Sequence, residues 1–166
     1  GIYVDCTAGG GGHSAEILSH LNENGKMYLF DRDPDAIKVL TERFSGDKRV
    51  NIIHDNYCNI KVALDVLGVT SVDGIVADLG VSSFQLDTAE RGFSFHSDAI
   101  LDMRMSKSGI TAADIVNTFT AKELSDILKY HNRKYYIEDS PEIEDFQYDA
   151  LLRELEDLEK GFKGLT

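Results

Sequence analysis

Short apolar runs alternate with helical patterns along the first half of the chain. Four apolar runs are typical of buried strands: residues 2–4, 27–30, 50–54 and 72–79. Apolar side chains recur at helical spacing over residues 35–44, and residues 60–67 resemble a helix that ends near Gly68. Short apolar strands separated by helices predict a parallel sheet that is covered on both faces. We therefore expect an α/β fold with the strand order 3-2-1-4.

A glycine-rich turn follows the first predicted strand. Asp5 closes the strand, four consecutive glycines occupy residues 9–12, and a helical pattern begins at His13. Glycines let ligand atoms reach the backbone, and a helix N-terminus presents unpaired N–H groups. The turn therefore predicts a cradle for an anionic or nucleoside ligand, and the alternative is a flexible glycine loop.

Asp31 follows the second strand and helps to distinguish between two cofactors. An acid about twenty residues after such a turn accepts hydrogen bonds from ribose hydroxyls in nucleotide-binding βαβ units. A dinucleotide fingerprint needs glycine at its sixth position, where this chain has Ser14. Asp5 would repel a pyrophosphate, whereas it suits the ammonium and sulfonium groups of S-adenosylmethionine. The turn favours S-adenosylmethionine over NAD and makes a dinucleotide-dependent oxidoreductase the weaker hypothesis.

Polar or aromatic residues follow all four predicted strands. Ligands of parallel sheets bind outside the carboxyl ends of the strands. Asp5, Asp31, Tyr57 and Asp78 all fall at those ends. Solvent exposure explains the polarity of any one of these residues, but core packing does not explain four of them at one edge of the sheet. We call these four residues the rim.

Composition limits the classes of partner. The chain has 166 residues, of which 42% are hydrophobic, and a formal net charge of −12. This charge opposes general electrostatic binding of nucleic acid, so any RNA contact must be local. No apolar run reaches the length of a membrane span, and the first residues already have a strand pattern rather than that of a signal peptide. Cys6 and Cys58 suit a reducing cytoplasm, and we expect no metal site.

Six motifs together resemble one known family. They are residues 9–14 (GGGGHS), 31–34 (DRDP), 78–83 (DLGVSS), 85–87 (QLD), 90–95 (ERGFSF) and 101–105 (LDMRM). In this order they resemble the bacterial 16S ribosomal RNA (cytosine-N4)-methyltransferase family over about residues 1–130. The resemblance implies a partial Rossmann-like methyltransferase sheet that uses S-adenosylmethionine, with the cofactor-binding core in residues 1–105.

The resemblance, together with the turn, assigns a set of cofactor contacts. They are Asp5, Gly9, Gly11, Gly12, His13, Asp31, Tyr57, Asp78 and Gln85. By this resemblance Asp31 would hold the ribose hydroxyls and Tyr57 would lie against the adenine.

The resemblance also implies a reaction, which is methyl transfer to an exocyclic amine. This transfer needs in-line placement and an acceptor for the amine proton. Asp78 is the catalytic candidate, by analogy with other amine methyltransferases. Arg91, Asp102 and Arg104 are candidates for contact with 16S ribosomal RNA or the small ribosomal subunit. The alternative for these three residues is an internal salt-bridge cluster that orders a long loop.

A second resemblance begins where the first one ends. Residues from about 128 to 160 are similar to the N-terminal helical subdomain of NAD-dependent DNA ligases, which grips nicotinamide mononucleotide. The ligand positions that it implies are Tyr135, Tyr136, Asp145, Tyr148 and Asp149. The ligases' nucleotidyl-transfer lysine motif is absent from the sequence, which excludes DNA ligation by this chain. An apolar stripe in this segment predicts that the helical region, residues 106–166, ends in a helical hairpin.

These observations leave two functional hypotheses open. The first is an S-adenosylmethionine-dependent ribosomal RNA methyltransferase, whose activity we expect to be impaired because later strands of the family sheet do not follow residue 130. The second is a non-catalytic module, natural fusion or chimera that binds S-adenosylmethionine or nicotinamide mononucleotide. An unpaired edge on the fourth strand would favour association, so we also expect a homodimer or a larger assembly.

Overall fold

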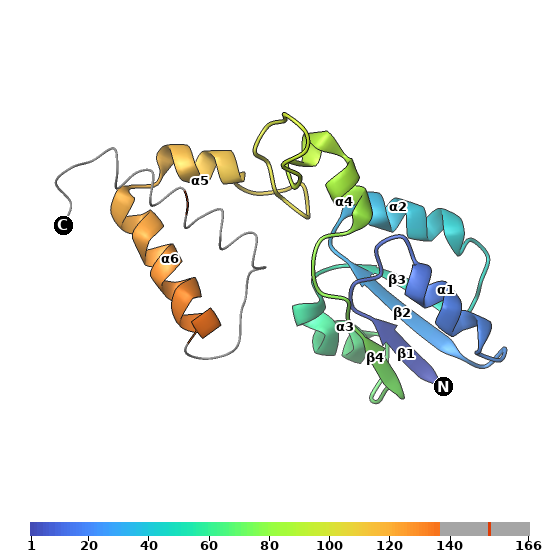
Figure 1. The fold of residues 1–166 in the computed structure, drawn as a ribbon. Coiled ribbons are helices and arrows are strands. Elements are labelled where there is room, and N and C mark those ends of the chain that lie inside the picture. Colours follow the sequence, from blue (N-terminus) through green and yellow to red (C-terminus); the bar gives the residue numbers. More distant parts are fainter. Residues whose placement is uncertain (137–152, 154–166) are drawn as a thin grey trace. The chain divides into compact units, whose positions relative to one another are not determined.

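The computed structural model describes residues 1–136 and residue 153. The chain forms two compact units (Figure 1). The first unit comprises Gly1–Ala99 and Met103–Gly109, and the second comprises Ile100–Asp102 and Ile110–Thr166. The domain boundary predicted between residues 105 and 106 stays a prediction. Along the chain, residues 100–102 belong to the second unit and residues 103–109 to the first.

The first unit contains a parallel sheet in the order β3-β2-β1-β4, which confirms the predicted topology. Its strands are β1 (Ile2–Asp5), β2 (Lys26–Asp31), β3 (Val50–His54) and β4 (Gly74–Val76). β4 is shorter than the apolar run at residues 72–79 predicts. At its carboxyl end the pairing with β1 stops, and the Asp78 N–H donates to the Thr7 hydroxyl at 2.7 Å rather than to a backbone carbonyl of β1.

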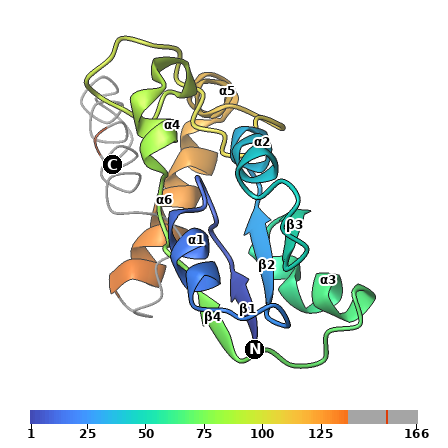
Figure 2. The ribbon, with the colours of Figure 1, turned by 90° about the vertical axis from the view of Figure 1, so that its right-hand side faces the viewer.

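Helices cover both faces of this sheet (Figures 1 and 2). α1 (Gly12–Ser19) and α2 (Pro34–Arg43) contribute Leu18 and Leu40 to one core, with Met27 and Leu29 of β2. α3 (Ile60–Val66) contributes Leu64 to a second core on the other face.

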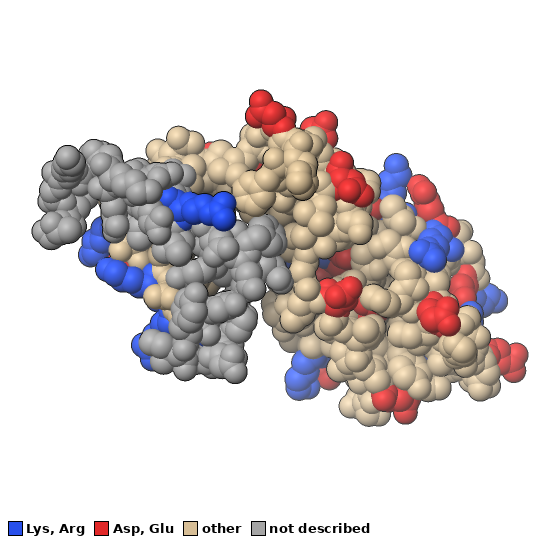
Figure 3. All heavy atoms as spheres, in the orientation of Figure 1, with Lys and Arg blue, Asp and Glu red and all other residues tan. Residues whose placement is uncertain are grey.

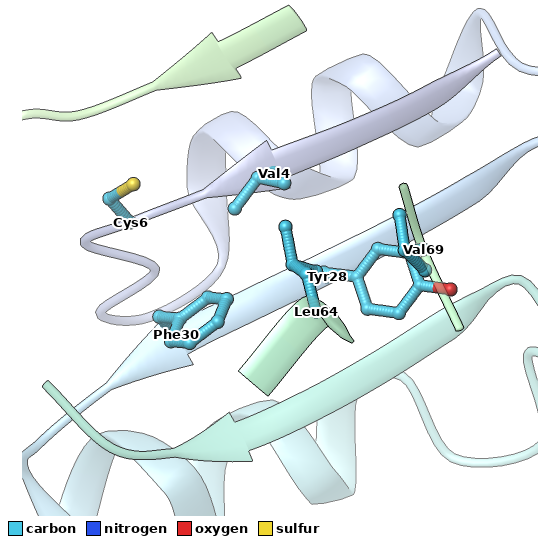
Figure 4. Close-up of a cluster of buried hydrophobic side chains, with 6 residues drawn as sticks. All are labelled: Val4, Cys6, Tyr28, Phe30, Leu64 and Val69. Atoms are coloured by element: carbon cyan, nitrogen blue, oxygen red, sulfur yellow. The ribbon is translucent and has the colours of Figure 1, made fainter. Parts of the chain in front are cut away.

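The second core shows how alternation along the strands divides the buried side chains. Val4, Tyr28 and Phe30 lie on the α3 side with Leu64 and Val69 (Figure 4). Successive residues of a strand point to opposite faces, so the apolar run at residues 27–30 is buried throughout. A strand covered on both faces is rigid, and β2 therefore gives Asp31 a fixed position at its end.

Short helical segments follow the third and fourth strands. A 3-10 turn, η1 (Tyr57–Asn59), precedes α3, and α4 (Ser83–Asp87) and a second turn, η2 (Ala89–Arg91), come after β4. α4 begins with a capping box in which the Ser82 hydroxyl accepts from the Gln85 N–H, while the Gln85 side chain accepts from the Ser82 N–H.

The second unit contains α5 (Ala112–Thr118) and α6 (Ala121–Tyr136). Thr111 caps α5, and Thr120 precedes α6, where hydrogen bonds from its N–H and hydroxyl lower the pKa of Glu123. Leu124 and Leu128 are buried on one side of α6. The second limb of the predicted hairpin lies outside the described residues.

Two further expectations concern association and the spanning of a membrane. Among the described residues β4 pairs only with β1, and Ile75 in it is 58% exposed. Assembly through this edge stays a prediction. None of the described helices has the length and apolar character needed to span a bilayer.

An ion pair between Arg49 and Asp47 at the amino edge of the sheet yields a pH-dependent prediction. Arg49 binds both carboxylate oxygens of Asp47, and its Nη1 donates to the carbonyls of Leu18 and Leu21 at 3.0 and 2.8 Å. These hydrogen bonds from Arg49 lower the pKa of Asp47 from 3.8 to about 2. A lowered pKa in the folded state means that the stabilisation is present above pH 3.8 and is lost as the pH falls toward about 2.

We expect Asp47→Asn to lower the free energy of unfolding at neutral pH, and the difference from wild type to shrink between about pH 4 and about pH 2. Urea titrations at several pH values measure this difference. Asp65→Asn is the control, because Asp65 pairs with Lys61 on the exposed surface of α3 and should show little effect at any pH. A difference between wild type and Asp47→Asn that persists at the lowest pH would contradict the assignment.

Candidate functional site

The structure brings the predicted rim residues to one edge of the sheet. All strand pairs are parallel, so Asp5 and Asp31 end neighbouring strands at the same edge. Tyr57 and Asp78 come shortly after β3 and β4 and belong to this edge as well. The rim hypothesis is therefore consistent with the strand directions.

Asp31 is held in a defined orientation. Its Oδ2 accepts from the Gly9 N–H at 2.8 Å, and its Oδ1 accepts from the Asp33 N–H at 2.8 Å. Each carboxylate oxygen has a further lone pair, and the residue is only half-buried. Asp31 can therefore accept two more hydrogen bonds, which is what a ribose diol requires.

Three glycines of the turn, Gly10, Gly11 and Gly12, fall into two groups according to the space around them. Gly11 has a φ of 76° at the N-cap of α1, and a Cβ there would lie 2.7 Å from Phe44 Cε2 and 3.0 Å from Leu40 Cδ2. The fold itself therefore requires glycine at Gly11. A Cβ at Gly10 or Gly12 would meet nothing within 4 Å. The open space beside these two residues can accommodate ligand atoms.

The N-terminus of α1 provides donors beside this space. No side chain caps it, and the Ala15 N–H is the one that bonds back to the Gly11 carbonyl, at 2.9 Å. The first N–H groups of a helix lack intrahelical acceptors and attract anions. Gly12 and His13 are exposed here. Arg43 of α2 fixes the turn from the side by donating to the Gly10 carbonyl at 2.6 Å.

Asp5 lies beneath the turn and is only 1% exposed. Its Oδ2 accepts from the Ser14 hydroxyl at 2.6 Å, and its Oδ1 accepts from the Thr7 N–H at 3.1 Å. Ser14 is fully buried, so this pair joins β1 to α1. A direct contact between Asp5 and a cofactor stays a prediction. Burial, with a smaller contribution from Asp5, also raises the pKa of the Cys6 thiol.

Tyr57 and Asp78 are the more exposed members of the rim. Tyr57 is 43% exposed at the start of η1, where the Asn56 side chain accepts from the Cys58 N–H. The Asp78 side chain is exposed, and its backbone is anchored on the Thr7 hydroxyl. Thr7 thus links the turns after β1 and β4. Sequence reasoning missed Thr7, because its role depends on a residue 71 positions away.

Gln85 and Arg91 meet at a single buried carboxylate. Gln85 Nε2 donates to Asp33 Oδ2 at 2.8 Å, and Arg91 Nη1 donates to the same oxygen at 2.7 Å. For Arg91 the structure therefore shows the internal ion pair, which was the alternative to an RNA contact.

The other candidate positions have different surroundings. Arg104 donates to the Gly109 carbonyl at 3.0 Å, and Asp102 accepts from the Ala112 N–H through its backbone. RNA contacts by these two residues stay predictions. Tyr135 and Tyr136 end α6, and the ligase-like positions Asp145, Tyr148 and Asp149 lie outside the described residues.

Two further features of the described residues are the distribution of surface charge and the grouping of side chains that could bind a metal ion. Over the described part of the face in Figure 3, acidic and basic side chains are interspersed on the first unit. The described residues also contain no group of three or more histidine, cysteine or acidic side chains that could hold a metal ion.

Alanine substitutions at the two kinds of glycine test which of them the turn requires. We expect Gly11→Ala to lower the free energy of unfolding by about 2–4 kcal/mol, from the left-handed backbone and the contacts with Leu40 and Phe44. Gly10→Ala is the matched control and should change it by less than about 0.5 kcal/mol. Urea unfolding measures both values, and equal effects of the two substitutions would contradict the distinction.

Comparison with known proteins gives one family. A family model described as the MraW methylase family matches residues 1–163. This match runs through residues 128–160, so the additional ligase resemblance of that segment stays a prediction.

Curated relatives are about half identical to the chain. "Ribosomal RNA small subunit methyltransferase H" of Clostridioides difficile (strain 630) is 51% identical over 131 residues, covering 78% of this chain and 42% of the relative. The protein of the same name from Finegoldia magna is 51% identical over 138 residues, covering 81% of this chain and 44% of the relative. The chain thus spans less than half the length of these relatives.

A crystal structure of a proposed rRNA methylase from Clostridium thermocellum is 27% identical, with a TM-score of 0.40, and the match covers 49% of this chain and 46% of that one. This score is too low to compare the sites. The family match, by contrast, covers almost the whole sequence. The chain therefore belongs to the MraW methylase family.

Proposed function

We propose that this chain binds S-adenosylmethionine at the carboxyl edge of its sheet, as part of a methyltransferase that acts on the N4 amine of a cytosine in 16S ribosomal RNA. The observation that carries the proposal is the Asp31 carboxylate, which two backbone N–H groups orient while leaving it free to accept from a diol. The names of the curated relatives support the ribosomal RNA substrate. The partner would be the small ribosomal subunit, and the place of action the bacterial cytoplasm.

The residues at the rim fit the chemical groups of this cofactor. The uncapped N-terminus of α1 suits the carboxylate of the methionine part. Asp31 suits the ribose, and the exposed ring of Tyr57 offers a surface for the adenine. The open space at Gly10 and Gly12 lets such a ligand approach the backbone closely.

When bound, the cofactor would supply a methyl group on a positively charged sulfur. The task of the chain is then to hold the acceptor amine in line and to accept the proton that the amine loses as its N–C bond forms. Asp78 is the proposed acceptor, because its carboxylate is exposed at the end of β4. The bond between its N–H and Thr7 Oγ1 fixes its backbone against the turn after β1.

Binding of S-adenosylhomocysteine tests the cofactor assignment. We expect wild-type protein to bind it in isothermal titration calorimetry and Asp31→Ala to lose about 1–3 kcal/mol, because the ribose diol would lack its acceptor. Asp31→Asn keeps one acceptor oxygen and should have an intermediate affinity. Asp65→Ala, on the exposed face of α3, is the control and should bind like wild type.

Two results would contradict this proposal. One is unchanged binding by a folded Asp31→Ala variant, which would place the site elsewhere. The other is tighter binding of NAD or nicotinamide mononucleotide than of S-adenosylhomocysteine, which would favour a different ligand class.

A further inference from the structure

Arg91 joins two segments that are far apart in the sequence. Its side chain is 6% exposed and reaches from η2 to the N-terminus of α2, where Nη1 donates to Asp33 at 2.7 Å and to Asp35 at 3.2 Å. Its Nη2 donates to the carbonyl oxygens of Arg104 and Met105, both at 2.9 Å. The guanidinium is therefore shared between two carboxylates and two backbone carbonyls.

The segment that Arg91 holds, residues 103–107, is here called the clasped loop. Its first N–H, from Met103, donates to the Arg91 carbonyl at 3.0 Å, and the Lys107 ammonium pairs with Asp35. Met103 and Lys107 have φ values of 58° and 57°, although neither is glycine. Left-handed conformations of bulky residues persist only where the surrounding contacts hold them. The Arg91 and Asp35 contacts help to hold this loop, together with the hydrogen bond from Arg104 to the Gly109 carbonyl.

Asp33 links Arg91 to Asp31 of the proposed cofactor rim. The Asp33 N–H donates to Asp31 Oδ1, and the Asp33 side chain caps α2 by accepting from the Asp35 N–H. Asp33 is 3% exposed, and its Oδ2 accepts from both Gln85 and Arg91. A buried carboxylate that loses its cation is costly to keep in place. A change at Arg91 would therefore move Asp33 and, with it, the donor that orients Asp31.

We propose that Arg91 is a positioning residue that couples the cofactor rim to the clasped loop. A ligand held by Asp31 favours the arrangement in which Arg91 binds Asp33, because the Asp33 N–H orients the Asp31 carboxylate. This arrangement also closes the loop. The inference rests on the proposed function, because the ligand is an S-adenosyl compound. Such coupling is reciprocal, so the closed loop must strengthen ligand binding by the same factor by which the ligand stabilises the loop.

Arg91→Lys is the variant that tests the coupling. Lysine keeps a positive charge beside Asp33, but its compact ammonium group cannot reproduce the planar fork that serves four acceptors. Trypsin reports on the loop, because the Arg104 carbonyl that Arg91 holds belongs to the bond that trypsin cleaves. We expect faster cleavage after Arg104 in the variant, quantified by mass spectrometry, and a Kd for S-adenosylhomocysteine that is about 5- to 50-fold higher. The ligand should slow this cleavage in wild type and have little effect on it in the variant.

Arg49→Lys is the matched control. Arg49 also combines an aspartate with two backbone carbonyls, but it does so at the amino edge of the sheet. This variant should lose thermal stability without a change in the Kd or in cleavage after Arg104. Asp35→Asn is a second test that leaves Asp33 intact, and it should change both readouts in the direction of Arg91→Lys, to a smaller extent.

The possible outcomes distinguish failure of the coupling from failure of the proposed function. If wild type binds S-adenosylhomocysteine and Arg91→Lys and Asp35→Asn match it in affinity and cleavage, the coupling is overturned and the cofactor assignment stands. The coupling is also overturned if Arg49→Lys changes both readouts as strongly as Arg91→Lys does. If wild type does not bind the ligand, the proposed function is overturned and the coupling with it.

Discussion

The Asp31 carboxylate accepts hydrogen bonds from Gly9 and Asp33, and these two bonds join the turns at the carboxyl edge of the sheet. They join the turn after β1 to the turn after β2 through a single side chain. Two backbone N–H groups hold the carboxylate in one orientation, so the Asp31 side chain is fixed before any ligand arrives. The rim is therefore organised in advance, and a diol would meet acceptors that need little rearrangement.

The sheet makes this arrangement possible by burying β2 on both faces. Met27 and Leu29 pack toward α1 and α2, and Tyr28 and Phe30 pack toward α3. The end of such a strand cannot shift without disturbing both cores, which is why β2 positions Asp31 firmly. β4 is the contrasting case, because it has only three residues. The position of Asp78 depends instead on the hydrogen bond that its N–H donates to the Thr7 hydroxyl.

The features that sequence could predict are those that local pattern determines. The strand order, the bounds of β3 at residues 50–54 and the placement of rim residues after each strand follow from apolar runs and the rules of parallel sheets. The early end of β4 and the burial of Arg91 depend on partners more than 50 residues away. No local pattern reports such partners, and an arginine in a polar segment is normally expected to be exposed. Ser14 is an intermediate case, because the sequence identified its position but not its hydrogen bond with Asp5.

The chain uses the same arrangement of groups at both edges of its sheet. Arg49 closes the amino edge by binding Asp47, the Leu18 carbonyl in the last turn of α1 and the Leu21 carbonyl just after that helix. Arg91 closes the carboxyl edge by binding Asp33 and two loop carbonyls. At the amino edge the arginine adds a donor to the carbonyls at and just beyond the end of α1, and this role is complete within the fold. Arg91 instead holds a loop in which Met103 and Lys107 have left-handed backbone conformations, and the surrounding contacts must offset the free energy that these conformations cost. A buried ion pair is weak evidence of stabilisation, so the proposed coupling explains the arrangement around Arg91 better than added stability does, through the position that Asp33 imposes on Asp31.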